Sequence, residues 1–320
     1  MKLISIVTPC YNEEDNVEDL YQQVKNVFAQ LPHYRYEHIF IDNASNDKTV
    51  ERLKKIAQLD KNVKIIVNTR NFGHIRSPYH ALLQAKGDAV VSIVSDLQDP
   101  PSMIKDFIHK WEQGYKIAIG VKPESEESKF MYNIRRMGYY WIGRIADVKL
   151  IKNFTGFGLY DKDVIKILRS YDDPYPYFRG MIADIGFDIA EIPYNQPQRK
   201  RGITKNNFYT LYDIGMLGIT SYSKIPLRIA AMCGFFLATL SLLFSGIFLI
   251  LKFLFWNSFS IGVAPILIGI FFFSSVQLFF IGLLGEYIAS INTRIMKRPL
   301  VVEKERINFE NTVQEVAVTE

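Results

Sequence analysis

The sequence is poor in cysteine, and it lacks low-complexity linkers and an N-terminal secretory signal. Its two cysteines, Cys10 and Cys233, provide no disulfide framework. One falls at an expected strand end and the other in an apolar helix, so a bond between them is implausible, which is compatible with a reducing compartment. Residues 1–3 run directly into a short strand pattern, without the apolar core and cleavage site of a signal peptide. We therefore expect the first domain to stay in the cytoplasm.

An excess of charge of one sign is also missing. The net charge is only +5 over 320 residues, and basic residues gather in two short clusters, Arg199–Lys205 and Arg294–Arg298. Nucleic-acid binding typically needs a broader basic face with stacking aromatic residues, so no nucleic-acid partner is expected. The local clusters favour an anionic ligand or an anionic lipid surface.

Long apolar runs are absent from the first 210 residues and appear only after Ile225. One run covers 225–256 and a second, uncharged one covers 261–284. Each exceeds the ~20 residues that a helix needs to cross a bilayer. Two buried helices of a soluble core are the alternative, but they are usually shorter. Basic residues lie mainly on the outer flanks, which predicts a multi-pass protein of the inner (cytoplasmic) membrane with both ends of the hairpin cytoplasmic.

The expected domains follow from this division. Residues 1–205 form an α/β domain, 225–292 a transmembrane helical hairpin, and 293–320 a cytoplasmic tail. Residues 206–224 carry apolar and aromatic side chains at helical spacing. Such a helix can lie in the membrane interface, or it can be an ordinary amphipathic helix that faces a core.

The first half alternates short β-branched runs with amphipathic stretches, which predicts a mostly parallel sheet covered on both faces. Ligands of such sheets bind beyond the carboxyl ends of the strands. Strands are expected at Leu3–Thr8, Tyr36–Ile41, Val63–Val67, Ala89–Ser95 and Lys116–Val121, and helices at Glu13–Gln30, Asp47–Gln58, His74–Ala85 and Pro101–Gln113.

Polar residues follow three of these strands. Tyr11 and Glu13, after the first strand, offer a stacking face and an acceptor for a nucleoside, although acids at a helix start are also ordinary capping residues. Asp42 follows the second strand and projects to the same edge. Asp96 and Gln98 follow the fourth, where their oxygens could hold a divalent cation at a diphosphate. Asp99, before two prolines, is interpreted as a helix cap.

Taken together, these loops resemble the family 2 glycosyltransferases with the GT-A fold. Within them the chain is similar to the polyprenyl-phosphate glycosyltransferases, relatives of dolichol-phosphate mannose synthase. The resemblance rests on Pro9–Glu14, Arg70–Gly73, Asp96–Pro101, Arg199–Lys205 and the terminal pair of apolar runs. It covers the chain up to about Pro299.

The resemblance implies a role for each matching residue. Pro9, Tyr11, Glu13 and Asp42, with Arg70, would hold the nucleotide. Asp96 and Gln98 would hold Mg²⁺ or Mn²⁺, and Asp96 would also act in catalysis. Arg199 and Lys205 would close over the phosphates, because guanidinium and ammonium groups suit phosphate oxygens. A solvated or lipid-facing loop is the alternative for this basic run.

Three positions depart from the family pattern. Val94 stands in place of one carboxylate of Asp-x-Asp, and Asn43-Ala44 replaces Asp-Gly after the second strand. Gly156 and Gly158 stand where relatives carry a candidate catalytic Asp and an Arg. Asp161 or Asp184 could replace the lost carboxylate, although Asp161 equally suits a helix cap.

We therefore expect an inverting transferase that moves a sugar from a nucleotide-sugar, a UDP-sugar in the leading hypothesis, to polyprenyl (undecaprenyl) phosphate at the cytoplasmic face. A phosphate monoester is already largely dianionic at neutral pH, so this acceptor needs no base. The alternatives are transfer to a glycolipid or polysaccharide hydroxyl, and a catalytically weakened membrane scaffold that binds nucleotide-sugar. The bilayer is the expected partner, and a homo-oligomer stays open.

Overall fold

A computed structural model describes the chain except for residues 123–150, 152, 197–207, 256–262 and 310–320. The chain divides into two compact units. Unit 1 comprises Met1–Ser128, Leu150–Asn206 and Lys297–Glu320, and unit 2 comprises Lys129–Lys149 and Asn207–Met296. The chain therefore leaves the first unit and returns to it after the long helices.

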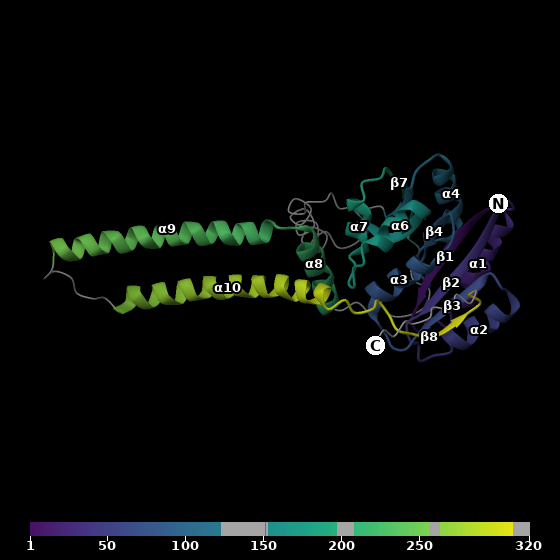
Figure 1. Cartoon of the computed structure of the whole chain (residues 1–320), viewed down its shortest axis with the longest axis horizontal. Coiled ribbons are helices and arrows are strands. Elements are labelled where there is room, and N and C mark those ends of the chain that lie inside the picture. The colour runs from purple at the N-terminus through teal and green to yellow at the C-terminus, as the bar shows by residue number, and fades with distance from the viewer. Residues whose placement is uncertain (123–150, 152, 197–207, 256–262, 310–320) are drawn as a thin grey trace, which may run out of the picture. The chain divides into compact units, whose positions relative to one another are not determined.

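Unit 1 is built on an eight-stranded sheet with the order β7-β5-β6-β4-β1-β2-β3-β8 (Figure 1). β1, β2, β3 and β4 are parallel neighbours, and β5 pairs in parallel with β7. β6 runs antiparallel to β4 and β5, and β8 antiparallel to β3, so the sheet is mixed. The strands are β1 Lys2–Cys10, β2 Tyr34–Asp42, β3 Val63–Asn68, β4 Ala89–Ser92, β5 Ile117–Val121, β6 Phe154–Asp161, β7 Ile189–Pro193 and β8 Glu303–Ile307.

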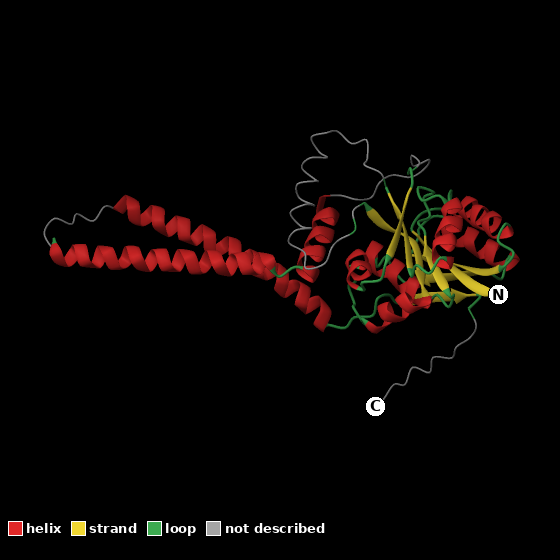
Figure 2. Cartoon of the chain, turned by 90° about the horizontal axis from the view of Figure 1, so that it is seen from above, coloured by secondary structure: helices red, strands yellow, loops and turns green. Residues whose placement is uncertain are grey.

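Helices lie on both faces of this sheet (Figure 2). One face packs against α1, α2 and α4, with buried apolar side chains such as Leu20, Leu53 and Phe107. The opposite face carries α3 and α6, and Tyr79 of α3 donates a hydrogen bond to the carbonyl oxygen of Leu168 in α6 at 2.8 Å. The helices of unit 1 are α1 Val17–Ala29, α2 Thr49–Leu59, α3 Gly73–Gln84, the 3-10 turn η1 Pro101–Met103, α4 Ile104–Glu112, α6 Lys162–Ser170 and α7 Phe178–Asp184.

The predicted α/β core is confirmed, because the five expected strands and four expected helices are all present with shifted ends. The sheet is less parallel than expected, since β6 enters it between β4 and β5. β6 contains Gly156 and Gly158, which the sequence shows only as departures from the family pattern. The antiparallel pairing of β6 comes from long-range contacts that strand patterning does not encode.

The C-terminal residues differ from the expected tail. β8 pairs with β3, with Ile65 opposite Ile307 and Val67 opposite Glu305. Its side chains hold α3 as well: Glu303 accepts from His80 at 2.6 Å, and Arg306 donates to Gln84 at 2.8 Å. Four charged residues followed by one isoleucine show no alternation of polar and apolar side chains, so the sequence carries no strand signal in this tail.

Unit 2 contains three described helices, α8 Phe208–Tyr222, α9 Ile225–Leu254 and α10 Val263–Ile295. Tyr287 of α10 donates to the carbonyl oxygen of Ser223 at 2.8 Å, and Arg294 donates to Ser221 at 2.8 Å. Large apolar side chains along α9 and α10 are exposed, among them Phe235 and Phe279. By length and composition, Phe272–Ile295 qualifies as a membrane span, and Gly215–Tyr222 with Ile225–Ser241 qualifies only as a pair bent by 74°.

Candidate functional site

The residues predicted to bind a nucleotide lie at the carboxyl ends of four neighbouring parallel strands. The register of β1 and β2 places Pro9 beside Ile41 and Cys10 beside Asp42. The loops after β3 and β4 carry Arg70 and Asp96 at the same edge, because these strands run in the same direction as β1. The fold therefore brings the predicted site residues to one edge of the sheet. They are Pro9, Tyr11, Glu13, Asp42, Arg70, Asp96 and Gln98, and the last two share the loop after β4.

The turn after β1 is fixed by the loop after β2. The backbone N–H groups of Asn12 and Glu13 donate to the side chains of Ser45 and Thr49, at 2.9 and 2.8 Å. Asn12 adopts a φ of 55° and returns a bond through its side chain, which accepts from the backbone of Asn46 at 2.9 Å. These bonds fix the backbone of the turn on which the predicted nucleoside-binding residues lie.

Asp42 is fully buried at the end of β2. Its carboxylate accepts from the backbone N–H of Ser45 at 2.9 Å and from the hydroxyl of the same residue. Burial raises the pKa of Asp42, and the bonds from Ser45 oppose that rise. Asp42 thus shapes its own loop, and a ligand would reach its carboxylate only if that loop moved, because the residue is 0% exposed.

The thiol of Cys10 lies in the middle of this edge and is buried. Burial, followed by the carboxylates of Asp42 and Glu13, raises its pKa, while a hydrogen bond with Ser95 lowers it. Acidic groups of the β1 and β2 loops and a polar group of the β4 loop therefore lie around the Cys10 thiol. The thiol stays protonated at neutral pH and serves as a small buried side chain.

Asn43 joins the β2 loop to the loop after β3. Its amide nitrogen donates to the side-chain oxygen of Asn71 at 2.8 Å and to the carbonyl oxygen of Gly73 at 3.1 Å. Its amide oxygen accepts from the backbone of Phe72 at 2.8 Å and from Asn68 at 3.2 Å. The sequence showed Asn43 only as a departure from the family pattern, and the structure shows that its amide uses both donors and its acceptor.

Arg70 precedes this anchored segment and is exposed at the edge of the sheet. Its guanidinium lies 4.0 Å from the centre of the Phe72 ring and donates to the carbonyl oxygen of Asn71 at 3.1 Å. Stacking on an aromatic ring holds an arginine in place while leaving its donors available. The position is suited to binding an anionic group at this edge.

Asp96 and Gln98 lie in a tight turn after β4. Leu97 between them has a φ of 59°, and the backbone N–H of Gln98 donates to the carboxylate of Asp96 at 3.2 Å. Both side chains are half-buried, whereas Val94, in place of the family's other carboxylate, is 39% exposed. Among the described residues there is no group of three His, Cys, Asp or Glu side chains able to hold a metal. The predicted cation ligands in this turn are thus one carboxylate and one amide, and their role stays a prediction.

The prediction that Asp99 caps a helix is wrong. No side-chain hydrogen bond caps η1 or α4, and Asp99 is buried and accepts from the hydroxyl of Tyr194 at 2.7 Å. Burial raises the pKa of Asp99, while Tyr194 and the cation of Lys122 lower it. The partner lies 95 residues away, so no local pattern could have revealed the pair.

The two glycines of β6 differ in the space around them. A Cβ on Gly158 would lie 2.6 Å from the carbonyl oxygen of Ala118, so the neighbouring strand excludes any side chain. A Cβ on Gly156 would have only the Phe178 ring nearby, at 3.8 Å, but the φ of +104° there favours glycine. The family's Arg has no counterpart at Gly158 because the backbones approach too closely.

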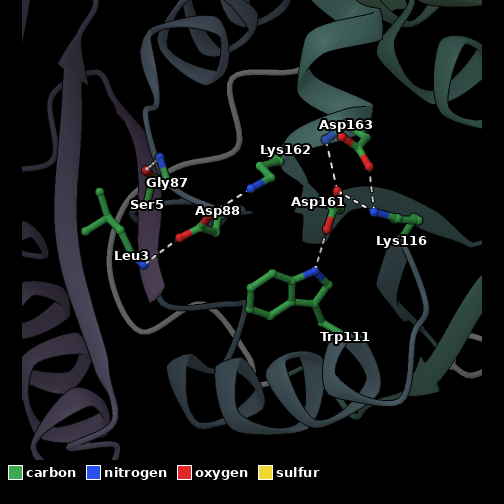
Figure 3. A network of polar contacts seen from close by, with 9 residues as sticks. All are labelled: Leu3, Ser5, Gly87, Asp88, Trp111, Lys116, Asp161, Lys162 and Asp163. Carbon is green, nitrogen blue, oxygen red and sulfur yellow. Dashed lines mark hydrogen bonds and ion pairs between the residues drawn. The ribbon is translucent and has the colours of Figure 1, made fainter. Parts of the chain in front are cut away.

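Asp161 is a structural residue, as its helix-cap interpretation predicts. It caps α6 by accepting from the backbone of Asp163 at 2.9 Å, and it accepts from Trp111 at 2.7 Å and Lys116 at 3.0 Å (Figure 3). Asp161, Trp111 and Lys116 line a pocket at the amino-terminal ends of the parallel strands, with Lys2 and Asp88. Asp161 is thus committed at the far edge of the sheet. Asp184 is exposed at the end of α7.

Arg199 and Lys205 lie outside the described residues, so their predicted roles remain predictions. The reasoning from sequence missed Asn43, Asp99 and Tyr194 as organisers of the site. Only Asn43 carried a signal, as a departure from the family pattern.

Known proteins match this chain in sequence. The profile of the family described as "Glycosyl transferase family 2" matches residues 5–168. The "Uncharacterized glycosyltransferase YkcC" of Bacillus subtilis is 32% identical and aligns over 96% of this chain and 95% of its own length. The "SfII prophage-derived bactoprenol glucosyl transferase" of Shigella flexneri is 31% identical over 94% of this chain and 97% of its own. Glucosyl-3-phosphoglycerate synthase from Mycobacterium tuberculosis, solved with Mn²⁺ and UDP, is 15% identical, with a TM-score of 0.43 over 68% of this chain and 78% of its own.

Proposed function

Because the chain belongs to glycosyl transferase family 2 and has its GT-A fold, we propose that it transfers a sugar from a nucleotide-sugar to a polyprenyl phosphate held in a membrane. The observation that carries this proposal is the extent of the match to relatives named bactoprenol glucosyl transferase, which includes 94% of this chain. The match therefore extends beyond unit 1 into α9 and α10 of unit 2. An acceptor with a long isoprenoid tail stays in the bilayer, and an enzyme that uses it has to work at that surface.

The long helices support a place in the membrane. α9 has 30 residues and α10 has 33, which corresponds to about 45–50 Å of helix against a bilayer core of about 30 Å. Exposed Phe and Leu side chains on both would be costly in water. We propose that the two helices span the inner membrane as a hairpin, with the basic flanks Arg228, Arg294 and Arg298 on the cytoplasmic face.

The donor would bind at the carboxyl-terminal edge described above. Tyr11 offers a face for stacking on the base, and Glu13 and Asp42 offer acceptors for base or ribose hydrogen-bond donors. Arg70 offers a cation for the phosphates. A UDP-sugar is our proposal for the donor, since a uracil N–H needs an acceptor such as these carboxylates.

A divalent cation fits the turn after β4. Mg²⁺ prefers one or two carboxylates completed by substrate phosphates and water, so the carboxylate of Asp96 with the amide oxygen of Gln98 is an adequate protein share. A Mg²⁺ or Mn²⁺ ion held there would neutralise charge on the departing diphosphate. Arg199 and Lys205 would add cations to the same group.

The described residues favour an acceptor that needs no general base. A phosphate monoester is largely dianionic at neutral pH, so an oxygen of the lipid phosphate can attack the anomeric carbon directly. The bond from that carbon to the diphosphate breaks as the new bond forms on the opposite face, which inverts the configuration. Gly156 brings no carboxylate to this reaction, and Asp161 is committed to Trp111 and Lys116. Orientation of the two phosphates is then the main catalytic requirement.

Incubation of the full chain in detergent with undecaprenyl phosphate and radiolabelled UDP-sugars tests the proposal. We expect a labelled lipid that is stable to base but cleaved by mild acid, formed only when Mg²⁺ or Mn²⁺ is present. Asp96→Asn should lower kcat at least about tenfold, because it removes the only charged ligand of the proposed cation. Asp106→Asn, which removes an exposed carboxylate from α4, is the matched control. Lack of product with every nucleotide-sugar would refute the proposal.

A further inference from the structure

Three arginines of unit 1 gather around the start of α3. The guanidinium carbons of Arg70 and Arg76 lie 4.0 and 5.3 Å from the centre of the Phe72 ring. Arg76 also donates to the carbonyl oxygen of Pro299, which brings the C-terminal segment with Arg298 to the same place. These residues come from the loop after β3, from α3 and from the segment after α10, and we refer to Arg70, Arg76 and Arg298 as the arginine cluster.

The cluster lacks negative charge of its own. Within the described parts of the chain, none of the three arginines forms an ion pair with a carboxylate. The Nε of Arg76 is buried without a hydrogen-bond partner. Burial, followed by the like charge of Arg70, lowers the pKa of Arg76; Tyr175 opposes this shift, and the like charge of Arg298 adds to it more weakly. The fold therefore holds cations near one another at a cost that an anion would offset.

The start of α3 adds to this electrostatic imbalance. α3 has no acidic residue in its first turn, and Arg76 lies close to the end where the helix dipole is positive. The backbone N–H of Gly73 is capped there by the side chain of Asn71 at 2.8 Å. A cation near a helix N-terminus is ordinarily unfavourable, whereas an anion bound between it and the helix end is favourable.

We propose that the arginine cluster binds the phosphate group of a membrane lipid, with Arg70 shared between this phosphate and the phosphates of the donor. Guanidinium groups bind phosphate oxygens through paired, charge-assisted hydrogen bonds, and three of them suit a dianion. The covalent chain sets the source of the phosphate, because Arg298 follows the last residue of α10, Ile295, by three positions. Three residues span at most about 10 Å, so a membrane-spanning α10 keeps Arg298 at the lipid headgroups. This step rests on the proposed function for the place of α10 in the membrane.

Two lipid phosphates share this chemistry, the monoester of a polyprenyl phosphate and the diester of a phospholipid headgroup. Binding can be measured without turnover, on the full chain in phosphatidylcholine nanodiscs. Farnesyl phosphate and farnesol share a tail and differ only in the phosphate, and phosphatidylglycerol incorporated in the nanodisc supplies an anionic diester, which the zwitterionic phosphatidylcholine does not. Arg298→Gln is the principal variant, since Arg298 is exposed and its removal leaves the bond between Arg76 and Pro299 in place. Arg35→Gln removes the same charge from an exposed position in β2 and is the matched control.

We expect the wild type and R35Q to bind farnesyl phosphate more tightly than farnesol, and R298Q to lose at least about tenfold in affinity for the phosphate alone. Arg298→Lys, which keeps the charge but not the paired donors, should recover part of the loss. If R298Q loses affinity only for nanodiscs that contain phosphatidylglycerol, the arginine cluster binds a phospholipid headgroup. That result supports the inference and identifies the phospholipid as the source of the phosphate. Unchanged binding of both phosphates by R298Q and by Arg76→Gln would overturn it.

The activity assay separates this inference from the proposed function. If the enzyme is active, R298Q should raise KM for undecaprenyl phosphate and leave KM for the nucleotide-sugar unchanged. If no nucleotide-sugar gives product while phosphate binding still depends on Arg298, the proposed transfer fails and the phosphate site stands. Product formation with unchanged KM for the lipid in R298Q, together with unchanged binding, would refute the site and leave the transferase intact.

Discussion

Replacement of Asn43 by aspartate tests how the β2 and β3 loops are joined. The change keeps the size of the side chain and one acceptor oxygen, so the bonds from Phe72 and Asn68 can persist. It turns the donating NH₂ into a second oxygen, which would face the side-chain oxygen of Asn71 and the carbonyl oxygen of Gly73. Two hydrogen bonds become two contacts between acceptors, inside a residue that is only 6% exposed.

The magnitude follows from these bonds. Each loses a net contribution of about 1 kcal/mol, and a buried acceptor without a donor costs about 1–3 kcal/mol more. Burial of the new carboxylate adds to the penalty unless it binds a proton. We expect N43D to lower the free energy of unfolding by about 2–4 kcal/mol at pH 7.5. Burial and the neighbouring oxygens raise the pKa of the introduced carboxyl above its unfolded value. The protonated form regains one donor, so the loss should shrink as the pH falls towards 5.

Thermal unfolding of the purified full chain in detergent, followed by intrinsic fluorescence at pH 7.5 and 5, measures the effect. Asn43→Ala is the control, because it removes the same donors without adding a titratable group, and its loss relative to the wild type should not depend on pH. The reasoning is refuted if N43D unfolds at the wild-type temperature at pH 7.5. It is also refuted if the deficits of N43D at the two pH values are equal.

Three further changes have expected outcomes. His38 is buried and its pKa is lowered to about 3, so it stays neutral in the folded protein and protonates on unfolding. Acidification below about pH 6.5 should therefore lower the free energy of unfolding, by about 2 kcal/mol at pH 5. His38→Gln should flatten this pH dependence in denaturant melts. Gly158→Ala places a Cβ 2.6 Å from a carbonyl oxygen of β5 and should cost about 1–3 kcal/mol, measured by the same melts. Against the effect of burial, hydrogen bonds from Arg306 and His80 lower the pKa of Glu303 to about 2. The contribution of Glu303 to the free energy of unfolding is therefore present above about pH 4.5 and is lost as the pH falls towards 2. Glu303→Gln should cost about 1 kcal/mol at pH 7 and make β8 more sensitive to limited proteolysis.

Each of these changes has its own control. Gly215→Ala adds a methyl group where nothing lies within 4 Å, so it should leave the melt unchanged or raise its midpoint. A wild-type melt that does not vary between pH 7.5 and 5 would contradict the interpretation of His38. If Glu303→Gln leaves proteolysis of the C-terminal segment unaltered, the ion pairs with α3 do not hold β8 in place.

The sequence by itself determined the α/β core of the first unit up to Val121 and the edge at which the predicted site residues lie. Periodicities of two and 3.6 residues are local properties, so the five strands and four helices up to Val121 could be predicted from them. Parallel neighbours in the order β4-β1-β2-β3 then place the ends of those strands together, which is why Pro9, Asp42 and Asp96 share one edge. The two long apolar helices also follow from composition alone.

Only the tertiary structure decided what each polar group is bonded to. Asp99 pairs with Tyr194 across 95 residues, and Asp161 binds Trp111 across 50, so neither partner is visible in a local pattern. The return of β8 to the sheet depends on pairing with β3 rather than on strand propensity, because five half-exposed residues specify little by themselves. The arginine cluster arises in the same way, since Arg76 and Arg298 lie more than 200 positions apart in the chain and meet only because the C-terminal segment comes back to α3.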